Sequence, residues 1–129
     1  MEKQFFNNMK LLIVDDIEEY LTSLENALRG EYKVLKARSL DDAKEVAKEN
    51  IDIALVDIKL SEEKPDNKDG LVFLEWLKMN YPKVPAITMS AYREFDLAVE
   101  ALNLGAEYFL KKPINLPELK GLLKTILSK

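Results

Sequence analysis

Residues 51–57 read Ile51-Asp52-Ile53-Ala54-Leu55-Val56-Asp57, a mostly apolar run that ends in a carboxylate. A short run of this kind predicts a strand buried on both faces, as in a parallel sheet. A second run, Leu11-Leu12-Ile13-Val14, ends the same way in Asp15-Asp16. Open α/β sheets bind ligands in the crevice outside the carboxyl ends of their strands. We therefore expect Asp15, Asp16 and Asp57 to converge on one crevice and to need a hard cation, because their charges would otherwise repel.

Strand and helix patterns alternate along the whole chain. The predicted strands lie at 11–14, 32–37, 51–56, 84–89 and 108–110. The predicted helices lie at 17–29, from Ser39 through Ala47, and at 70–80, 93–104 and 116–127. Five β/α units predict an α/β fold: a doubly wound five-stranded parallel sheet in the flavodoxin-like order 2-1-3-4-5. The 129 residues suit one domain over 9–129, with an N-terminal extension at 1–8.

The amino-acid composition excludes several classes of function. The chain has no cysteine and no histidine, which excludes disulfides, thiol chemistry, a Ser/His/Asp triad and histidine metal sites. The net charge is −4, and the 19 basic and 23 acidic residues are interleaved without the basic stripe of a nucleic-acid-binding protein. No apolar run approaches the roughly 20 residues of a membrane span. We expect a cytoplasmic protein that binds neither nucleic acid nor membrane directly.

Polar residues stand at the ends of four predicted strands: Asp15-Asp16, Asp57, Ser90 and Lys112. Each has an ordinary structural explanation when it is taken alone. For Asp15 and Asp16, capping of the next helix and a functional role are equal alternatives. Ser90 alone is typical of a turn and Lys112 alone of a solvated surface, whereas no helix follows Asp57 directly. The conjunction of the four strand ends favours a functional site.

Spaced motifs cover the same strand ends. They are Leu12-Ile13-Val14-Asp15-Asp16, Leu55-Val56-Asp57, Met89-Ser90-Ala91 and Gly105-Ala106-Glu107-Tyr108-Phe109-Leu110-Lys111-Lys112-Pro113. With these motifs, the chain resembles the receiver domain of two-component response regulators over roughly residues 9 to 128. The set carries the resemblance, since each motif alone is weak.

The resemblance implies a role for each strand-end residue. Asp57 would be the phosphoacceptor, taking a phosphoryl group from a phosphohistidine of a histidine kinase or histidine phosphotransfer protein. Asp15, Asp16, Asp57 and the backbone carbonyl of Lys59 would hold Mg²⁺ (or Mn²⁺). Ser90 would hydrogen-bond the phosphoryl oxygens and Lys112 would supply positive charge. The protein would be no classical enzyme, although it would take part in phosphotransfer and self-dephosphorylation.

The same resemblance implies a switch. Ser90 would be drawn towards the phosphoryl group, and Phe109 would change rotamer into the space left behind; a half-buried strand aromatic is the equal alternative for Phe109. The output face would comprise 93–104, 108–111 and 116–127, for a downstream target or an attached effector domain. A homodimer through the last two helices is compatible with the sequence. A stand-alone receiver and part of a longer regulator are both compatible as well.

Two features depart from the family or go beyond it. The loop over 61–69 is longer than in typical receivers, and Ser61 stands where proline is usual. A tolerated surface insertion is the favoured interpretation; screening of the site or choice of partner is the sharper one. Lys59 and Tyr92 each follow a site residue by two positions. Their side chains are hypothesised to overhang the phosphoryl group and to set the acyl-phosphate lifetime, against plain solvent exposure.

Two other functions are alternatives to the phosphorylated switch. A haloacid-dehalogenase-like phosphatase also uses an aspartate nucleophile and Mg²⁺, but it needs Asp-x-Asp after its first strand, where this chain has Asp15-Asp16. A receiver-like docking module that works without phosphorylation is the main alternative. The complete acidic set with Ser90 and Lys112 argues against it.

Overall fold

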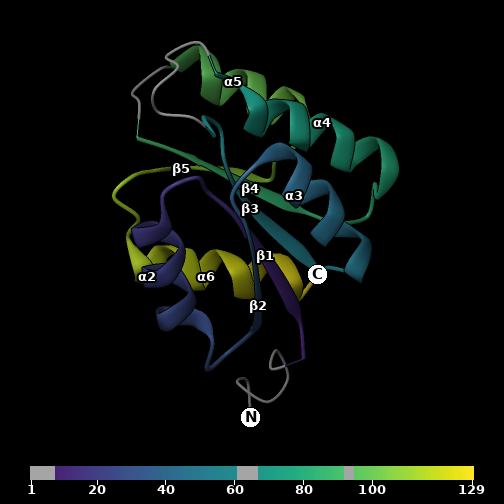
Figure 1. Ribbon diagram of the computed structural model, residues 1–129. Helices are drawn as coiled ribbons and strands as arrows, with labels where there is room; N and C mark the ends of the chain where they lie inside the picture. The colour runs from purple at the N-terminus through teal and green to yellow at the C-terminus, as the bar shows by residue number, and fades with distance from the viewer. Residues whose placement is uncertain (1–7, 61–66, 92–94) are drawn as a thin grey trace.

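A parallel sheet forms the centre of the protein, which we describe from a computed structural model over residues 8–60, 67–91 and 95–129. Five strands stand in the order β2-β1-β3-β4-β5, which confirms the predicted α/β fold and strand order (Figure 1). Their bounds are β1 Lys10–Val14, β2 Lys33–Ala37, β3 Ile53–Asp57, β4 Ala86–Ser90 and β5 Tyr108–Lys111.

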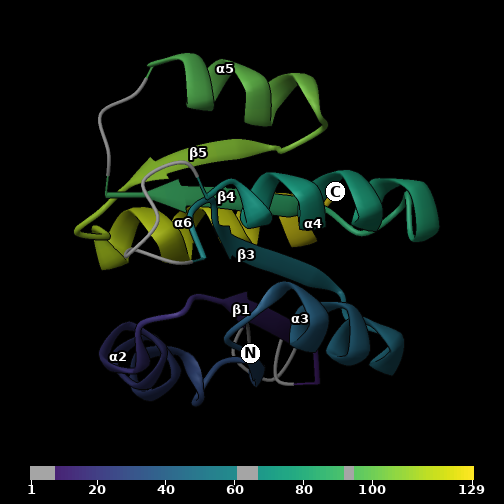
Figure 2. The same cartoon turned by 45° about the horizontal axis from the view of Figure 1, so that its top comes forward.

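Helices cover both faces of the sheet. Their bounds are α2 Glu18–Leu28, α3 Leu40–Val46 (continued by the short 3-10 helix η1, Ala47–Glu49), α4 Asp69–Asn80, α5 Phe95–Asn103 and α6 Leu116–Leu127. α2 and α6 lie on one face, and α3, α4 and α5 lie on the other (Figures 1 and 2). This division follows from right-handed crossovers on the two sides of β1. Within the described residues, no helix has both the length and the apolar composition needed to cross a bilayer.

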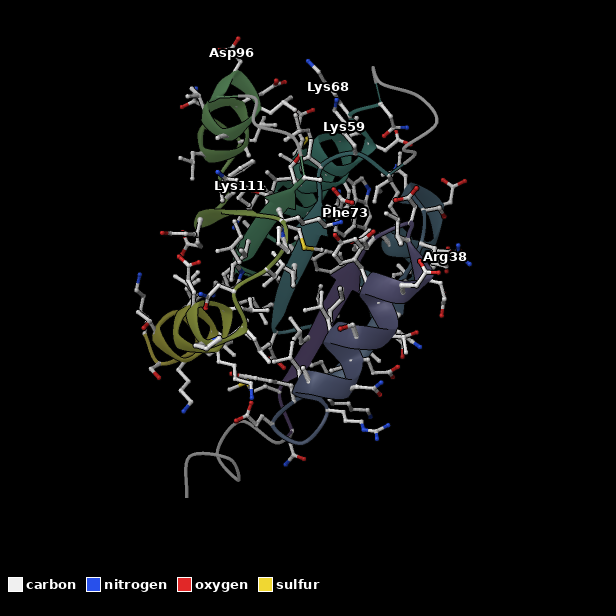
Figure 3. The ribbon with its side chains drawn as sticks, turned by 90° about the vertical axis from the view of Figure 1, so that its left-hand side faces the viewer. Arg38, Lys59, Lys68, Phe73, Asp96 and Lys111 are labelled. Carbon is white, nitrogen blue, oxygen red and sulfur yellow. The ribbon has the colours of Figure 1, made fainter. Side chains whose placement is uncertain are left out.

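The apolar strands feed two separate cores. In β1, Leu11 and Ile13 belong to the cluster under α2 and α6, whereas Leu12 and Val14 belong to the cluster under α3, α4 and α5. Phe73 of α4 is fully buried in the second cluster (Figure 3). Burial on both faces explains why the strands read as continuous apolar runs rather than alternating ones.

The element ends match the sequence signals with small differences. The Ser39 side chain accepts a hydrogen bond from the Asp42 N–H at 3.2 Å, as the predicted helix start requires. β4 begins one residue after Pro85 and extends to Ser90, instead of covering 84–89. Proline lacks an N–H, but the Pro85 carbonyl still accepts a hydrogen bond from the Ala54 N–H at 3.0 Å. The described part of α5 begins at Phe95 and ends at Asn103, within the predicted 93–104.

Candidate functional site

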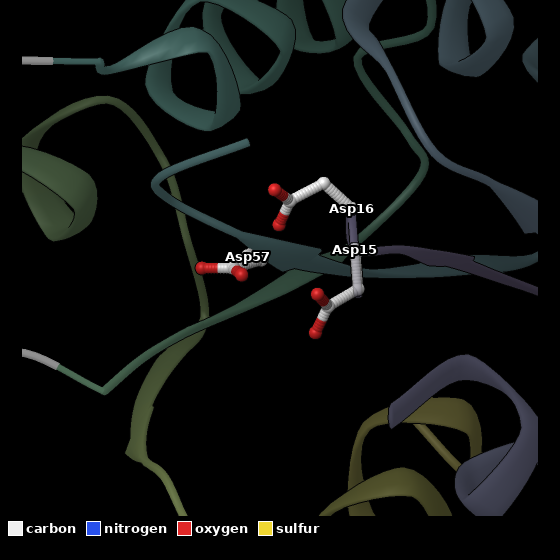
Figure 4. A group of neighbouring side chains, drawn as sticks. All are labelled: Asp15, Asp16 and Asp57. Atoms are coloured by element: carbon white, nitrogen blue, oxygen red, sulfur yellow. The ribbon is translucent and has the colours of Figure 1, made fainter. Parts of the chain in front are cut away.

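Three carboxylates gather at the carboxyl edge of the sheet. β1 and β3 pair in parallel with Val14 beside Val56, so Asp15 and Asp57 come next on neighbouring strands. One carboxylate oxygen from each of Asp15, Asp16 and Asp57 lies within 4.8 Å of the others (Figure 4). Asp15 is 0% exposed and Asp57 is 3% exposed. The predicted convergence of these residues is therefore present in the fold.

Lys112 reaches the same place from the segment after β5. Its Nζ lies 2.6 Å from Asp15 Oδ2 and 3.0 Å from Asp57 Oδ2, and its side chain is 1% exposed. Its backbone N–H donates to the Ser90 carbonyl at 2.9 Å, which holds the segment against the end of β4. The interpretation of Lys112 as a solvated surface lysine is wrong, because the ammonium group is buried between two carboxylates.

Burial dominates the electrostatics of Asp57. Loss of hydration raises the pKa of Asp57 to about 7, although the nearby Lys112 charge lowers it; Asp15 raises it further. Burial also lowers the pKa of Lys112, but Asp57 and Asp15 outweigh this and raise the pKa above its ordinary value. The site therefore favours a further cation beside Asp57, since the carboxylate stays costly to ionise even with Lys112 next to it.

Main-chain groups fix the two buried carboxylates. Asp57 Oδ1 accepts a hydrogen bond from the Lys59 N–H at 3.2 Å, and Asp15 Oδ1 accepts one from the Ile17 N–H at 3.0 Å. Ile17 occupies the N-cap position of α2, with no side-chain capping bond. Asp16 is therefore not the cap of this helix, and the capping alternative fails for it. Asp15 both accepts the hydrogen bond from the Ile17 N–H at the start of α2 and belongs to the acidic cluster.

Arg38 supports the loop that carries Asp16. Its Nη2 donates to the Asp16 carbonyl at 3.0 Å, and its Nη1 lies 3.6 Å from Glu18 Oε2. Arg38 follows β2 and lies at the surface (Figure 3). An exposed ion pair of this kind stabilises a protein by ~1 kcal/mol at most, so its main effect is to hold the loop backbone in place.

Two residues at the site were missed by sequence reasoning. Tyr20 of α2 places its ring centroid 4.0 Å from Lys112 Nζ. Gly70, in the first turn of α4, donates its N–H to the Ile58 carbonyl at 2.8 Å. The signal for Gly70 was a glycine at the start of a predicted helix, because glycine is the residue that permits a close approach of backbones. No sequence signal connected Tyr20 to Lys112, because that contact depends on packing between distant elements.

The predicted switch residues occupy adjacent strands. Ser90 ends β4, is 0% exposed and pairs with Lys111 in β5. Phe109 pairs with Thr88, is half-buried and packs against the core cluster under α3, α4 and α5. This position agrees with both interpretations of Phe109, so its switch role stays a prediction.

The hypothesis that the side chains of Lys59 and Tyr92 overhang the phosphoryl group concerns one described residue, Lys59. Lys59, labelled in Figure 3, is 5% exposed, so the alternative of plain solvent exposure is wrong for this residue. Tyr92 lies outside the described residues. The Lys59 carbonyl stays a predicted metal ligand.

The predicted long loop is tied at its two ends. Asn67 Oδ1 accepts hydrogen bonds from the Leu60 N–H at 3.0 Å and from the Asp69 N–H at 2.9 Å. Residues 61–66 lie outside the described residues, and α4 already begins at Asp69. One side chain therefore links the end of the segment after β3 to the start of α4.

The donor set fits a hard divalent cation. Asp15, Asp16 and Asp57 supply only carboxylate oxygens, which are the ligands that Mg²⁺ and Ca²⁺ prefer. The described part of the cluster contains no softer donor, in keeping with a chain that lacks cysteine and histidine. A flavodoxin-like α/β protein with a cation site and a buried lysine at its carboxyl edge is the class that fold and site define.

Comparison with known families identifies the family within this class. The model of the response regulator receiver domain matches residues 11–124, and the chain belongs to this family. It is 35% identical over 124 residues to the transcriptional regulatory protein ZraR of Escherichia coli K12, covering 95% of this chain and 27% of that protein. The chain thus spans about a quarter of the length of the curated relatives it matches.

Solved structures agree with this membership. A CheY-like receiver domain protein from Methanospirillum hungatei is 33% identical, with a TM-score of 0.81 and coverage of 94% of both chains. A response regulator from Burkholderia pseudomallei is 28% identical, with a TM-score of 0.80 and coverage of 94% of this chain and 69% of that one. The Burkholderia structure contains a phosphorylated aspartic acid and a calcium ion.

Proposed function

We propose that this receiver domain accepts a phosphoryl group on Asp57 in a Mg²⁺-dependent reaction. One observation carries the assignment: Lys112 Nζ lies 3.0 Å from Asp57 Oδ2 and 2.6 Å from Asp15 Oδ2, in a buried site. Asp15 shares this contact with Lys112, and the resemblance of Leu55-Val56-Asp57 to the family motif supports Asp57 as the phosphoacceptor of the pair. The phosphorylated aspartic acid and the calcium ion of the Burkholderia relative support the same assignment.

The donor is proposed to be a phosphohistidine on a histidine kinase or a histidine phosphotransfer protein. An Asp57 carboxylate oxygen attacks the phosphorus, and the phosphorus–nitrogen bond breaks with its electron pair moving to the imidazole. Phosphoryl transfer depends mainly on in-line positioning and on neutralising charge at the phosphoryl oxygens. Lys112 supplies a point charge there, and Mg²⁺ held by Asp15, Asp16, Asp57 and the Lys59 carbonyl would supply the rest. A chain without histidine can therefore perform this chemistry.

The output follows from the charge added at Asp57. A phosphoryl group brings negative charge and acceptor oxygens to the ends of β3 and β4. Ser90 hydrogen-bonds these oxygens, and Phe109 responds on the neighbouring strand. The affected surface comprises α5, β5 and α6, and it acts on an attached effector domain, a separate target or a second copy of the chain. Relatives such as ZraR, named a transcriptional regulatory protein, support an attached effector.

The acyl phosphate is a mixed anhydride of a carboxylic acid and phosphoric acid. Water hydrolyses it, so the domain returns to its unphosphorylated state. The buried Lys59 follows Asp57 by two residues. Its side chain is proposed to obstruct or orient the hydrolytic water and so to set the lifetime of the phosphorylated state. The domain is thus a phosphoacceptor with a built-in decay rate.

Intact mass after incubation with acetyl phosphate and Mg²⁺ tests the proposal. We expect a gain of one phosphoryl group that requires Mg²⁺ and is absent in Asp57→Ala. Failure to form the adduct, with the fold intact and hydrolysis shown to be slow, would contradict the proposal. That result would favour the docking module that works without phosphorylation.

A further inference from the structure

The Lys112 ammonium group has an aromatic contact in addition to its two carboxylates. Nζ lies 4.0 Å from the centroid of the Tyr20 ring, within the roughly 6 Å over which a cation is attracted to an aromatic face. Tyr20 belongs to the first turn of α2, and its N–H donates to the Ile17 carbonyl at 3.1 Å. The short connection from Asp15 to α2 therefore places this ring beside the acidic cluster.

A buried ammonium group needs favourable contacts on every side that has lost water. The Lys112 side chain is 1% exposed, and Asp15 and Asp57 account for two of its contacts. A cation–π contact is stronger when the cation is desolvated. The ring face thus compensates for hydration that the carboxylates do not replace.

The ring differs from the carboxylates in one respect that bears on the reaction. Asp15 and Asp57 belong to the oxygen cluster that can hold a divalent cation, so in a loaded site they divide their charge between two cations. Tyr20 is uncharged and its ring face is no ligand for a hard cation. Its contact with Lys112 can therefore persist whether or not the carboxylates are engaged by metal or by a phosphoryl group.

We propose that Tyr20 is a positioning residue for phosphoryl transfer, whose ring face holds the Lys112 ammonium group in place beside Asp57. This inference rests on the proposed function, since Lys112 is the group that neutralises the phosphoryl oxygens. Tyr20 acts through Lys112 and touches no reacting atom.

The first test detects where the Lys112 ammonium group lies in the unphosphorylated protein, without any phosphoryl transfer. In lysine side-chain NMR spectra, the Lys112 ammonium signal is identified by its loss in Lys112→Arg. We expect a slowly exchanging ammonium group whose protons are shifted upfield by the ring. Tyr20→Phe keeps both properties and Tyr20→Leu loses them. An unchanged Lys112 signal in Tyr20→Leu would overturn the proposal.

The second test measures the rate of phosphorylation by acetyl phosphate. Tyr20→Leu should react about two- to thirty-fold more slowly, and Tyr20→Phe at nearly the wild-type rate. Phenylalanine and its mono-, di- and trifluorinated analogues at position 20 then separate electrostatics from shape. Fluorine withdraws electron density from the ring face with little change in size, so the rate should fall with each fluorine. Equal rates along the series would mean that the ring acts only by filling space and would contradict the proposal.

A matched tyrosine controls for general loss of stability. Tyr81 is also half-buried, but it packs against Trp76 with ring centroids 5.9 Å apart and precedes β4, at the opposite edge of the sheet from Asp57. Tyr81→Leu should leave the Lys112 signal and the phosphorylation rate unchanged.

Tyr20→Leu should still fold. Tyr20 lines a pocket of about 210 Å³ beside Pro113 and Leu116, and it is not part of either core cluster.

The two tests keep the proposals distinguishable. If wild-type protein formed no phosphoryl adduct, the proposed function would fail. The NMR signature would still decide whether Tyr20 positions the Lys112 ammonium group. If wild type reacted and Tyr20→Leu displaced Lys112 without slowing the reaction, the positioning role would be overturned while the proposed function stood.

Discussion

Gly70 lies so close to the main chain of Asp57 that no side chain fits between them. A Cβ built on Gly70 would be 2.0 Å from the Asp57 carbonyl oxygen and 2.5 Å from Ile58 Cα. The Gly70 N–H also donates to the Ile58 carbonyl at 2.8 Å. The first turn of α4 therefore rests directly on the backbone that carries the proposed phosphoacceptor.

We expect Gly70→Ala to push α4 away from the end of β3. Overpacking of this kind typically costs about 1–3 kcal/mol, and it should also slow phosphorylation by moving Asp57. Urea unfolding followed by the fluorescence of Trp76, the single tryptophan, measures the stability. Gly121→Ala is the control, because nothing lies within 4 Å of a Cβ built there and the change should stabilise α6 by up to about 1 kcal/mol. Equal stability of the two variants would contradict this account.

Mg²⁺ should stabilise the folded protein. An ion that binds only the folded state adds about 2.7 kcal/mol at 100 times its dissociation constant. A thermal unfolding series with Mg²⁺, and then with a chelator, measures the gain and its removal. Asp16→Asn should lose most of the gain, whereas Asp96→Asn, an exposed aspartate on α5, should keep it. A Mg²⁺ effect of the same size in both variants would place the ion elsewhere.

The stability of the metal-free protein should fall as the pH rises from about 4 to about 7. Burial raises the pKa of Asp57 from 3.8 to about 7, so the folded protein holds a proton that the unfolded chain has released. Ionisation therefore works against folding across this window, by a few kcal/mol as an order of magnitude. Urea unfolding of wild type and Asp57→Asn across the window isolates the effect. Parallel pH profiles for the two proteins would show that Asp57 titrates normally.

Lys59 and Tyr92 are expected to set the lifetime of the acyl phosphate. Lys59→Ala should change the rate of self-dephosphorylation because Lys59 is buried and follows Asp57 by two residues. Intact mass followed over time after removal of acetyl phosphate measures this rate. Lys44→Ala is the control, because Lys44 belongs to α3 and its Nζ lies 5.7 Å from the centroid of the Trp76 ring of α4, outside the acidic cluster. Unchanged lifetimes in both Lys59 and Tyr92 variants would remove the hypothesis.

The charged segment between Leu60 and Asn67 gives a further prediction. If it screens the site or selects a partner, its deletion should change phosphotransfer or dephosphorylation rates; unchanged rates would leave a tolerated insertion. Asn67→Ala measures separately what the loss of the hydrogen bonds at the ends of the segment does to stability. It should cost about 1–3 kcal/mol by leaving two N–H groups without their acceptor, with little change in the rates if Asp57 stays in place.

Sequence reasoning worked best where topology alone decides proximity. Asp15 and Asp57 had to meet once their strands were parallel neighbours, because the ends of such strands share one edge. The place of Lys112 came from family resemblance, since nothing in the local sequence distinguishes it from the exposed Lys111. Its burial between Asp15 and Asp57 became evident only in the fold.

Close packing accounts for most of what was missed. The contact of Tyr20 with Lys112 joins elements far apart in the chain, and the close approach of Gly70 to Asp57 joins two consecutive elements, β3 and α4, across a loop. Hydrophobic periodicity records neither contact. The end of β4 was also placed one residue early. A serine after an apolar run reads as a turn, although Ser90 continues the ladder opposite Lys111.

The two hydrogen bonds of Asn67 make the neighbouring stretch a natural grafting point. Because one side chain already joins Leu60 to Asp69, chain closure there does not depend on the residues between Leu60 and Asn67. A reporter peptide or fluorophore inserted between Leu60 and Asn67 would be joined to the chain close to Asp57 in the sequence, and it should leave the sheet, the acidic cluster and α4 unaltered. The domain could in this way be converted into a sensor of its own phosphorylation.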